Sequence, residues 1–306
     1  MVVAKKTDIL LESGTNELGV LEFTIANKHF GINVAKISTI MQYSADIVSM
    51  PNSNPYVEGV FKPREQIMTV LNLPLYLGLP ESEHPERDIL LITHFNKINT
   101  AFHVHGVEVI HRISWEQIEK PDRTIYGGTD ALATGIARID GRLITIVDFE
   151  KIVSDICPEL GIQVDEVDEI EYRDRSDKTI MIAEDSVFLE KLLIESLQRS
   201  GYNKLIRCSN GKEAWEKLEE FSKTGQPIED FVSCVITDIE MPHMDGHHLT
   251  KRIRLDSKLS KLPVIIFSSL ISEKMMEKGE KLGASAQITK PEIGNLVRLV
   301  DNCILA

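Results

Sequence analysis

The sequence predicts a multidomain protein with an all-β N-terminal half and an α/β C-terminal half. Three observations predict this division: the length of 306 residues, an acidic stretch near the middle, and a change in the spacing of apolar residues across it. A chain of this length has room for about two domains of the usual size of ~150 residues. With 42% hydrophobic and 26% charged residues, its composition is that of an ordinary globular protein.

The acidic stretch separates the two halves. Residues 162–177 read IQVDEVDEIEYRDRSD, with seven acidic residues, two arginines and no sustained amphipathic period. Like charges repel one another along such a segment and keep it solvated. We therefore predict a first domain over residues 1–160, a linker over 161–177 and a second domain over 178–306.

Charge and composition exclude several kinds of partner. The net charge is -13, with 28 acidic against 16 basic residues before residue 178 and 19 against 18 from there on. This charge opposes non-specific attraction to nucleic acid or anionic lipid. The four cysteines form no CxxC pair, and neither a signal peptide nor an apolar run of membrane-spanning length occurs. We expect a cytoplasmic protein with no direct membrane insertion.

Apolar and polar residues alternate in the first half, which is typical of β-strands. Asp140-Gly141 between two such segments is a strong hairpin signal. Helical patterns are sparse, with residues 36–41 and 114–120 as the best candidates. Many short strands at close spacing predict an antiparallel barrel or sandwich. The expected strands cover residues 19–26, 28–34, 67–73, 88–95, 99–110, 131–139 and 142–149.

Apolar strands alternate with helical stretches after the acidic segment. Residues 187–201 carry leucines at i, i+3, i+4 spacing and end at Gly201, a favourable C-cap. Strands that alternate with helices specify a parallel sheet covered on both faces. Five strands are expected, over residues 178–185, 203–208, 231–238, 262–269 and 286–290.

Polar residues end these strands, where an open α/β sheet carries its site. They are Glu184 and Asp185 after the first strand, Asp238 after the third, Ser268 after the fourth and Lys290 after the fifth. Carboxylates that converge repel one another, and a hard divalent cation such as Mg²⁺ relieves that repulsion. One carboxylate can then attack a phosphoryl group while the hydroxyl and the lysine meet its oxygens. The pattern predicts an aspartyl phosphate.

The second half resembles a response-regulator receiver domain, which has a flavodoxin-like (βα)5 fold. The resemblance is carried by Glu184-Asp185, the stretch TDIEMPHMDG over residues 237–246, Ser268 thirty residues after Asp238, and Lys290 followed by proline. It implies that Asp238 is the phosphoacceptor and that Ser268 and Lys290 bind the phosphoryl oxygens. The implied Mg²⁺ ligands are Asp185, Asp238 and the backbone carbonyl of Glu240, with Glu184 assisting through water.

Gln287 departs from the receiver pattern. Receivers usually carry Tyr or Phe three residues before the lysine, and rotation of that ring reports phosphorylation. Here the position holds Gln287, so the aromatic part of the switch is in doubt. This departure keeps an alternative open, in which the second half acts as a phosphate sink that accepts and hydrolyses phosphoryl groups while the first half only localises the protein.

The first half contains no catalytic constellation, which favours a binding module. Its segments 21–43, 54–73, 102–110 and 135–153 resemble a CheW domain, the coupling module of bacterial chemotaxis arrays. The resemblance implies two small SH3-like five-stranded barrels that bind a histidine kinase through an apolar patch and chemoreceptor tips through a groove. The implied partner-binding residues are Ile37, Thr39, Met41 and Gly59 near the kinase and Arg64 near the receptor. Core packing is the other interpretation for the apolar ones, and a structural ion pair for the arginine.

Histidines gather in two places and raise the hypothesis of a transition-metal site. The two groups are His94, His103, His105 and His111 in the first half and His243, His247 and His248 in or after the phosphoacceptor stretch. Ordinary positions on a strand face or an exposed loop are the other interpretation.

A CheW-like domain followed by an acidic linker and a receiver matches the arrangement of CheV-type chemotaxis proteins. The resemblance implies an adaptor that couples chemoreceptors to a histidine kinase and is recruited to receptor arrays at the membrane. It implies phosphorylation of Asp238 by that kinase and no enzymatic activity beyond this phosphoryl transfer and autodephosphorylation.

Overall fold

The computed structural model describes residues 15–44, 46–63, 66–95, 98–119, 132–157, 177–269, 273–290 and 292–304. The chain forms two compact units, the first mainly from residues 18–113 and 120–158 and the second mainly from residues 159–306. Of the expected linker over 161–177, only the last residue lies within the described ranges. No helix in these ranges has both the length and the hydropathy that a membrane span requires.

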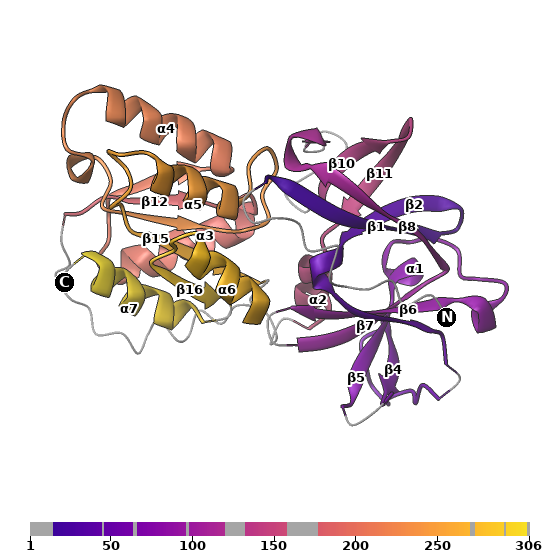
Figure 1. Cartoon of the computed structure of the whole chain (residues 1–306). Helices are drawn as coiled ribbons and strands as arrows, with labels where there is room; N and C mark the ends of the chain where they lie inside the picture. The colour runs from indigo at the N-terminus through magenta and orange to yellow at the C-terminus, as the bar shows by residue number, and fades with distance from the viewer. Residues whose placement is uncertain are drawn as a thin grey trace. The chain divides into compact units, whose positions relative to one another are not determined.

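Strands dominate the first half of the chain (Figure 1), as predicted. One sheet has the order β8-β1-β2-β11-β10-β9. Two-residue turns with positive φ join its hairpins, because such turns match the twist of the strands. Asp140 (φ 49°) and Gly141 (φ 79°) form the predicted turn between β10 and β11. The strands are β1 (Glu17–Ile25), β2 (Lys28–Asn33), β8 (Gly106–Ser114), β9 (Ile118–Glu119), β10 (Ala133–Ile139) and β11 (Arg142–Val147).

A second sheet has the order β3-β6-β7-β5-β4. Its strands are β3 (Ile37–Gln42), β4 (Val57–Phe61), β5 (Met68–Asn72), β6 (Ile89–Phe95) and β7 (Ile98–Val104). The helices α1 (Leu73–Tyr76) and α2 (Phe149–Ile156) complete the first half, and Phe149 and Ile152 of α2 are fully buried in its core. Asp148 caps α2 by accepting hydrogen bonds from the backbone N–H groups of its first turn.

Three expectations for the first half are wrong. Residues 36–41 carry apolar side chains at helical spacing, but Ile37–Gln42 is strand β3, whose β-branched residues pair with β6. The expected helix over 114–120 is only a 3-10 turn, Trp115–Gln117, followed by β9. Residues 99–110 were expected to form one strand, but they belong to β7 and β8, which lie in different sheets.

The second unit has the expected five-stranded parallel sheet, in the order β13-β12-β14-β15-β16. The strands are β12 (Ile180–Ala183), β13 (Leu205–Cys208), β14 (Cys234–Thr237), β15 (Val264–Ser268) and β16 (Ala286–Thr289). The helices are α3 (Val187–Arg199), α4 (Gly211–Lys223), α5 (Gly246–Leu255), α6 (Glu273–Lys281) and α7 (Ile293–Ile304).

Both faces of this sheet are buried. Alternate residues of β12 point to opposite faces: Met181 packs with side chains of α4 and α5, whereas Ile180 packs with side chains of α3 and α7. All four residues of β12 and of β14 are buried, as expected for a parallel sheet between two helical layers. Because the strands are parallel, the polar residues that follow them all lie at the carboxyl-terminal end of the sheet.

Candidate functional site

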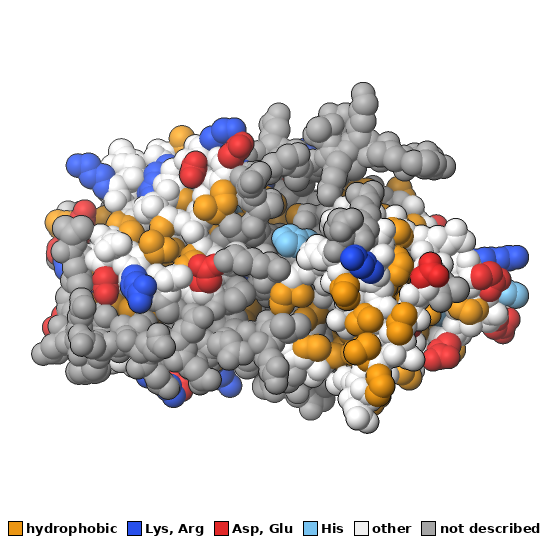
Figure 2. Space-filling view, turned by 90° about the horizontal axis from the view of Figure 1, so that it is seen from below, with side chains coloured by type: hydrophobic (Ala, Val, Ile, Leu, Met, Phe, Trp, Pro, Cys, Tyr) orange, Lys and Arg blue, Asp and Glu red, His pale blue; other side chains and the backbone are white. Residues whose placement is uncertain are grey.

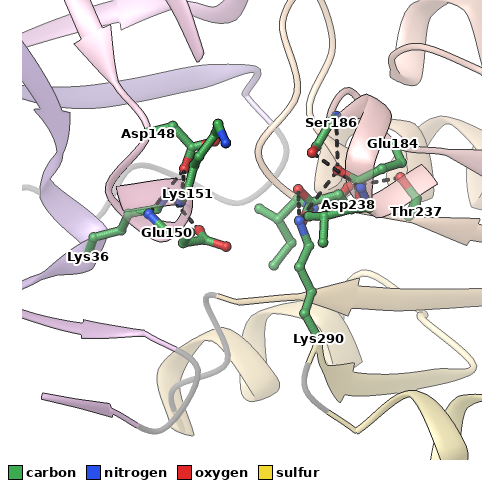
Figure 3. Close-up of polar contacts among 11 residues, drawn as sticks. Lys36, Asp148, Glu150, Lys151, Glu184, Ser186, Thr237, Asp238 and Lys290 are labelled. Atoms are coloured by element: carbon green, nitrogen blue, oxygen red, sulfur yellow. Dashed lines mark hydrogen bonds and ion pairs between the residues drawn. The ribbon is translucent and has the colours of Figure 1, made fainter. Parts of the chain in front are cut away.

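Three charged side chains meet at the carboxyl ends of β12, β14 and β16. The Nζ atom of Lys290 lies 2.8 Å from Oδ2 of Asp238 and 3.4 Å from Oε2 of Glu184. Figure 3 shows Lys290 reaching from the end of β16 toward the two carboxylates. Glu184 is 2%, Asp238 5% and Lys290 3% exposed, so the cluster is almost completely withdrawn from water.

Asp185 completes a group that can hold a metal ion. One carboxylate oxygen from each of Glu184, Asp185 and Asp238 lies within 4.8 Å of the others. Within the described ranges, no other three His, Cys, Asp or Glu side chains come together in this way. An all-carboxylate set of this kind suits a hard cation such as Mg²⁺.

Acidic side chains outnumber basic ones among the four side chains of this group. Burial, together with the charges of Asp238 and Asp185, raises the pKa of Glu184 well above its usual value, although the charge of Lys290 acts in the opposite direction. The group thus contains three carboxylates and one ammonium group, that of Lys290. A divalent ion would supply the missing positive charge, so the residues present fit Mg²⁺.

The backbone around Asp238 holds its carboxylate in place. Its Oδ1 atom accepts a hydrogen bond from the N–H of Ile239 at 2.6 Å, and its backbone carbonyl accepts one from the Thr237 hydroxyl at 2.9 Å. At Gly246, a Cβ atom would lie only 1.9 Å from that same carbonyl oxygen. Asp245 then caps α5 by accepting a hydrogen bond from His248 N–H at 2.7 Å.

Sequence reasoning assigned no role to Thr237, Asp245 or Gly246, although all three lie in the phosphoacceptor stretch. The Asp-Gly pair just before a helix was a usable signal, since aspartate is a preferred N-cap residue. The close approach at Gly246 depends on how the loop folds back, which no local pattern shows.

The other predicted residues of the second unit lie near the same edge of the sheet. Ser268 is fully buried at the end of β15, and its backbone carbonyl accepts a hydrogen bond from Lys290 N–H at 3.3 Å. Glu240 is buried in the loop two residues after Asp238. The sheet thus brings Glu184, Asp238 and Lys290 into direct contact and places the remaining candidates on adjoining segments.

Gln287 is hydrogen-bonded to a helix. Its Nε2 atom donates to the backbone carbonyl of Met276 in α6 at 2.7 Å. A Cβ atom at Gly279 would lie 2.1 Å from Oε1 of Gln287, so the amide fills a slot that exists because Gly279 has no side chain. The residue that replaces the aromatic ring of other receivers therefore fixes α6 against β16.

The four histidines proposed as metal ligands in the first half have different polar partners. His94 contacts Asn99, His105 accepts a hydrogen bond from Ala26 N–H, and His111 contacts Glu22, while His103 lies between two carboxylates. His243, His247 and His248 contribute to no metal-binding group in the part of the chain that the structure describes. The transition-metal hypothesis gains no support from this arrangement.

The predicted partner-binding residues occupy different environments. Ile37 is buried in the core at 7% exposure, so it supports the surface rather than forming it. Thr39 is exposed and Met41 half-buried on β3. Gly59 is buried, and a Cβ atom there would lie 2.3 Å from the carbonyl oxygen of Val48. Arg64 lies outside the described residues.

A pocket of about 840 Å³ opens beside Met41 in the first unit. Its lining includes Met41, Tyr43, Val48, Val60, Phe61 and Ile67. Val48 is 62% and Ile67 65% exposed, which is unusual for such apolar side chains. Figure 2 shows hydrophobic side chains gathered on the face of this unit that is turned toward the viewer.

Comparisons with known proteins match both halves. Residues 19–157 match the CheW-like domain and residues 180–301 the response regulator receiver domain. The chemotaxis protein CheV3 of Helicobacter pylori is 28% identical over 265 residues, which cover 85% of this chain and 84% of that protein. CheV1 of the same organism is 26% identical over 305 residues, covering 93% and 92% of the two chains.

Solved structures resemble the halves separately. The scaffolding protein TtCheW of Thermoanaerobacter tengcongensis is 18% identical, with a TM-score of 0.39, and the match covers 43% of this chain and 84% of that one. The domain matches and the full-length relatives define a chemotaxis signal-transduction protein with a coupling domain and a receiver. The chain belongs to the CheV-type chemotaxis coupling proteins.

Proposed function

We propose that this protein couples chemoreceptors to a histidine kinase and that Mg²⁺-dependent phosphorylation of Asp238 regulates the coupling. The observation that carries the proposal is the buried contact of 2.8 Å between Lys290 and Asp238, beside carboxylate oxygens that lie within 4.8 Å of one another. A group of three carboxylates at the ends of the strands, beside a lysine, supports a cation-binding site with a phosphoacceptor more than it supports a single structural ion pair.

The proposed reaction is phosphoryl transfer from a phosphohistidine of the kinase. A carboxylate oxygen of Asp238 attacks phosphorus, so that an O–P bond forms while the N–P bond breaks. The electron pair of the N–P bond stays on the ring nitrogen, and the histidine leaves as neutral imidazole after taking up a proton from solvent where its ring does not already carry one. In this proposal Lys290 and Ser268 would bind the phosphoryl oxygens, and the N–H of Ile239, which donates to Oδ1 of Asp238, would orient the attacking carboxylate. Hydrolysis of the acyl phosphate returns Asp238 to its starting state.

Mg²⁺ would be held by Asp185, Asp238 and the backbone carbonyl of Glu240, with Glu184 assisting through water. Bound there, it supplies positive charge that offsets the negative charge of the transferring group. The chemistry of the carboxylate group supports this assignment, since its possible ligand atoms are all carboxylate oxygens.

The first unit would provide the docking surfaces. We assign the kinase-facing surface to Thr39, Met41 and the pocket beside them, with Ile37 and Gly59 supporting it from within. Exposed apolar side chains around a pocket favour a protein partner, because burying them on binding removes apolar area from water. Arg64 is assigned to the receptor side. Binding to these partners would recruit the protein to receptor arrays.

Incubation with an autophosphorylated chemotaxis kinase tests the proposal. We expect transfer of labelled phosphate to the full-length protein with Mg²⁺ and none with a chelator or with Asp238→Ala. Asp230→Ala is a matched control, since Asp230 is exposed and lies outside the site. Transfer to Asp238→Ala at the wild-type rate would overturn the assignment of the phosphoacceptor.

The phosphate-sink function is a second candidate, which the amide at position 287 favours. Position 287 holds glutamine, so no aromatic ring is present there to report phosphorylation. Its amide instead donates a hydrogen bond to α6. Transfer and dephosphorylation rates compared with those of the kinase's other regulator separate the two functions. Equal binding of kinase and receptor by wild type, Asp238→Ala and a phosphoryl-mimic-bound protein would contradict regulated coupling and support the sink.

A further inference from the structure

A histidine lies between two carboxylates inside the first unit. The Nδ1 atom of His103 is 2.6 Å from Oε1 of Glu58, and its Nε2 atom is 2.9 Å from Oδ2 of Asp88. The side chains of His103, Glu58 and Asp88 are 8%, 14% and 4% exposed. This cluster plays no part in the phosphoacceptor chemistry.

The geometry favours the charged form of the ring. Ionised carboxylates only accept hydrogen bonds, so both ring nitrogens of His103 must donate, and only the imidazolium has two donors. Burial by itself lowers the pKa of His103, but the hydrogen bonds and charges of Glu58 and Asp88 outweigh burial and raise it above the usual value.

The cluster joins the two edges of the second sheet. In the order β3-β6-β7-β5-β4, strands β3 and β4 are at opposite edges. Tyr43, directly after β3, donates from its hydroxyl to Oε2 of Glu58 on β4 at 3.0 Å. Its backbone N–H donates to the carbonyl of Asp88 at 2.8 Å, and its ring centroid lies 4.3 Å from that of His103. These contacts bring the ends of the sheet together around the imidazolium.

The same two edges form the walls of the pocket. Met41 and Tyr43 line it from the end of β3, and Val60 and Phe61 line it from β4. Val48, which also lines the pocket, pairs with Val60 of β4. The cluster therefore contacts both walls of the pocket, since Glu58 lies on β4 and accepts a hydrogen bond from Tyr43 after β3.

We propose that His103 is a positioning residue for the docking surface: as an imidazolium it holds the two walls of the pocket in place, so that partner binding there depends on pH. The inference rests on the proposed docking of the kinase at this pocket. It adds a residue and a pH dependence that the docking assignment does not contain.

Other titratable groups around the ring do not replace this role. Burial lowers the pKa of His105, which favours its neutral form, and raises the pKa of Tyr43 to about 12, so its hydroxyl stays protonated at neutral pH. The second carboxylate oxygen of Asp88 accepts from the Ser82 hydroxyl at 2.9 Å. The groups that face His103 or its partners are Glu58 on β4, Asp88 before β6, Tyr43 after β3, His105 on β7 and Glu81.

The direction of the pH dependence follows from the raised pKa. The contribution of the imidazolium is complete below the ordinary histidine pKa of about 6.5 and is lost as pH rises through the raised pKa of the folded state. Binding at the pocket is therefore strongest in mildly acidic solution and weakens in alkaline solution.

The test uses the full-length protein and two measurements. Histidine NMR follows the titration of His103 together with the methyl signals of Met41 and Val60, and kinase binding is measured from about pH 6 to about pH 9. We expect the methyl signals to shift with the His103 titration and the kinase affinity to fall about tenfold as the ring loses its proton. His103→Gln should bind weakly with a flat pH profile, and His84→Gln, an exposed histidine, should behave as wild type.

Tyr43→Phe keeps the test decisive if His103→Gln does not fold. It removes only the hydroxyl that reaches Glu58, and we expect a smaller, roughly threefold loss of affinity. Methyl signals that do not change as His103 titrates would overturn the inference. So would a kinase affinity of the wild type that does not change between about pH 6 and about pH 9. If the methyl signals shift with the His103 titration but the kinase binds at no pH, the proposed docking would be contradicted and the positioning role of His103 in the pocket would stand.

Discussion

Two buried clusters in this chain each place one cation between two carboxylates, and they differ in how their charges are satisfied. In the first unit, Tyr43, Ser82 and His103 donate to the carboxylates of Glu58 and Asp88. In the second unit, Lys290 is 2.8 Å from Asp238 but 3.4 Å from Glu184, and Asp185 adds a third carboxylate.

The difference shows what separates a structural cluster from a reactive one. The His103 cluster has donors for its acceptors, so it gains nothing from another ion and holds strands together. In the Lys290 cluster, the oxygens of three carboxylates come within 4.8 Å of one another, an arrangement that suits a divalent cation. Both clusters are buried, so the grouping of three carboxylates, rather than burial, distinguishes the proposed phosphoacceptor site.

Replacing the positively charged side chain of each cluster tests the difference between the two clusters most strongly. We expect Lys290→Met and His103→Leu each to cost about 3 kcal/mol, because each leaves buried carboxylates without a counter-charge. Millimolar Mg²⁺ should restore much of the stability of Lys290→Met and none of that of His103→Leu. Hydrogen exchange in β12 and β14, compared with β6 and β7, measures both effects.

Lys223→Met is the matched control for these variants. Lys223 is 70% exposed and forms only a surface pair with Glu219, so its loss should change stability by less than about 0.5 kcal/mol. Rescue of both cluster variants by Mg²⁺, or of neither, would show that the two clusters do not differ as described.

Changing Glu184→Gln sharpens the comparison by removing the excess charge. The metal-free second unit should become more stable, and its affinity for Mg²⁺ should fall about tenfold. Titration calorimetry measures the affinity and thermal unfolding the stability. Glu195→Gln, on the exposed side of α3, should change neither quantity. An unchanged Mg²⁺ affinity would remove Glu184 from the metal site.

The stability of the first unit should depend on pH through His103. Its raised pKa means that the folded state keeps a proton that the unfolded chain releases, so the free energy of unfolding falls as pH rises from about 6.5 through the raised value. Hydrogen exchange in β6 and β7 measures this loss of stability, which should grow as pH rises through the raised pKa of His103. Exchange that is equally pH-dependent in His103→Gln would assign the effect to another group.

The smallest effect is expected at Gln287. Gln287→Leu removes the hydrogen bond to Met276 and should lower the local stability of α6 by about 1 kcal/mol. Hydrogen exchange of the α6 amides before and after phosphorylation measures it. Gln198→Leu, at an exposed position of α3, is the control. Unchanged α6 exchange would show that this amide does not fix the helix.

Local patterns predicted much of the second unit and less of the first. The strands of the parallel sheet are continuous apolar runs, and the polar residues that follow them fall at one edge by topology alone, which is why Glu184, Asp238 and Lys290 could be placed together. The Asp140-Gly141 turn was predictable for the same local reason, since its residues tolerate positive φ.

The remaining features depend on pairings between distant residues. Ile37–Gln42 has helical spacing but pairs with β6, which begins about fifty residues later. Both interpretations of His103, a metal ligand or a half-exposed strand residue, missed its true environment, because Glu58 and Asp88 lie 45 and 15 residues away in sequence. Such partners become visible only when the sheet closes.

The carbonyl oxygen of Asp238 occupies the space that any side chain at Gly246 would need. Saturation mutagenesis at this codon should therefore return a single functional amino acid, even alanine being rejected, although the residue binds no ion and carries no reactive group. Receivers engineered from this scaffold must therefore keep that glycine at the start of α5.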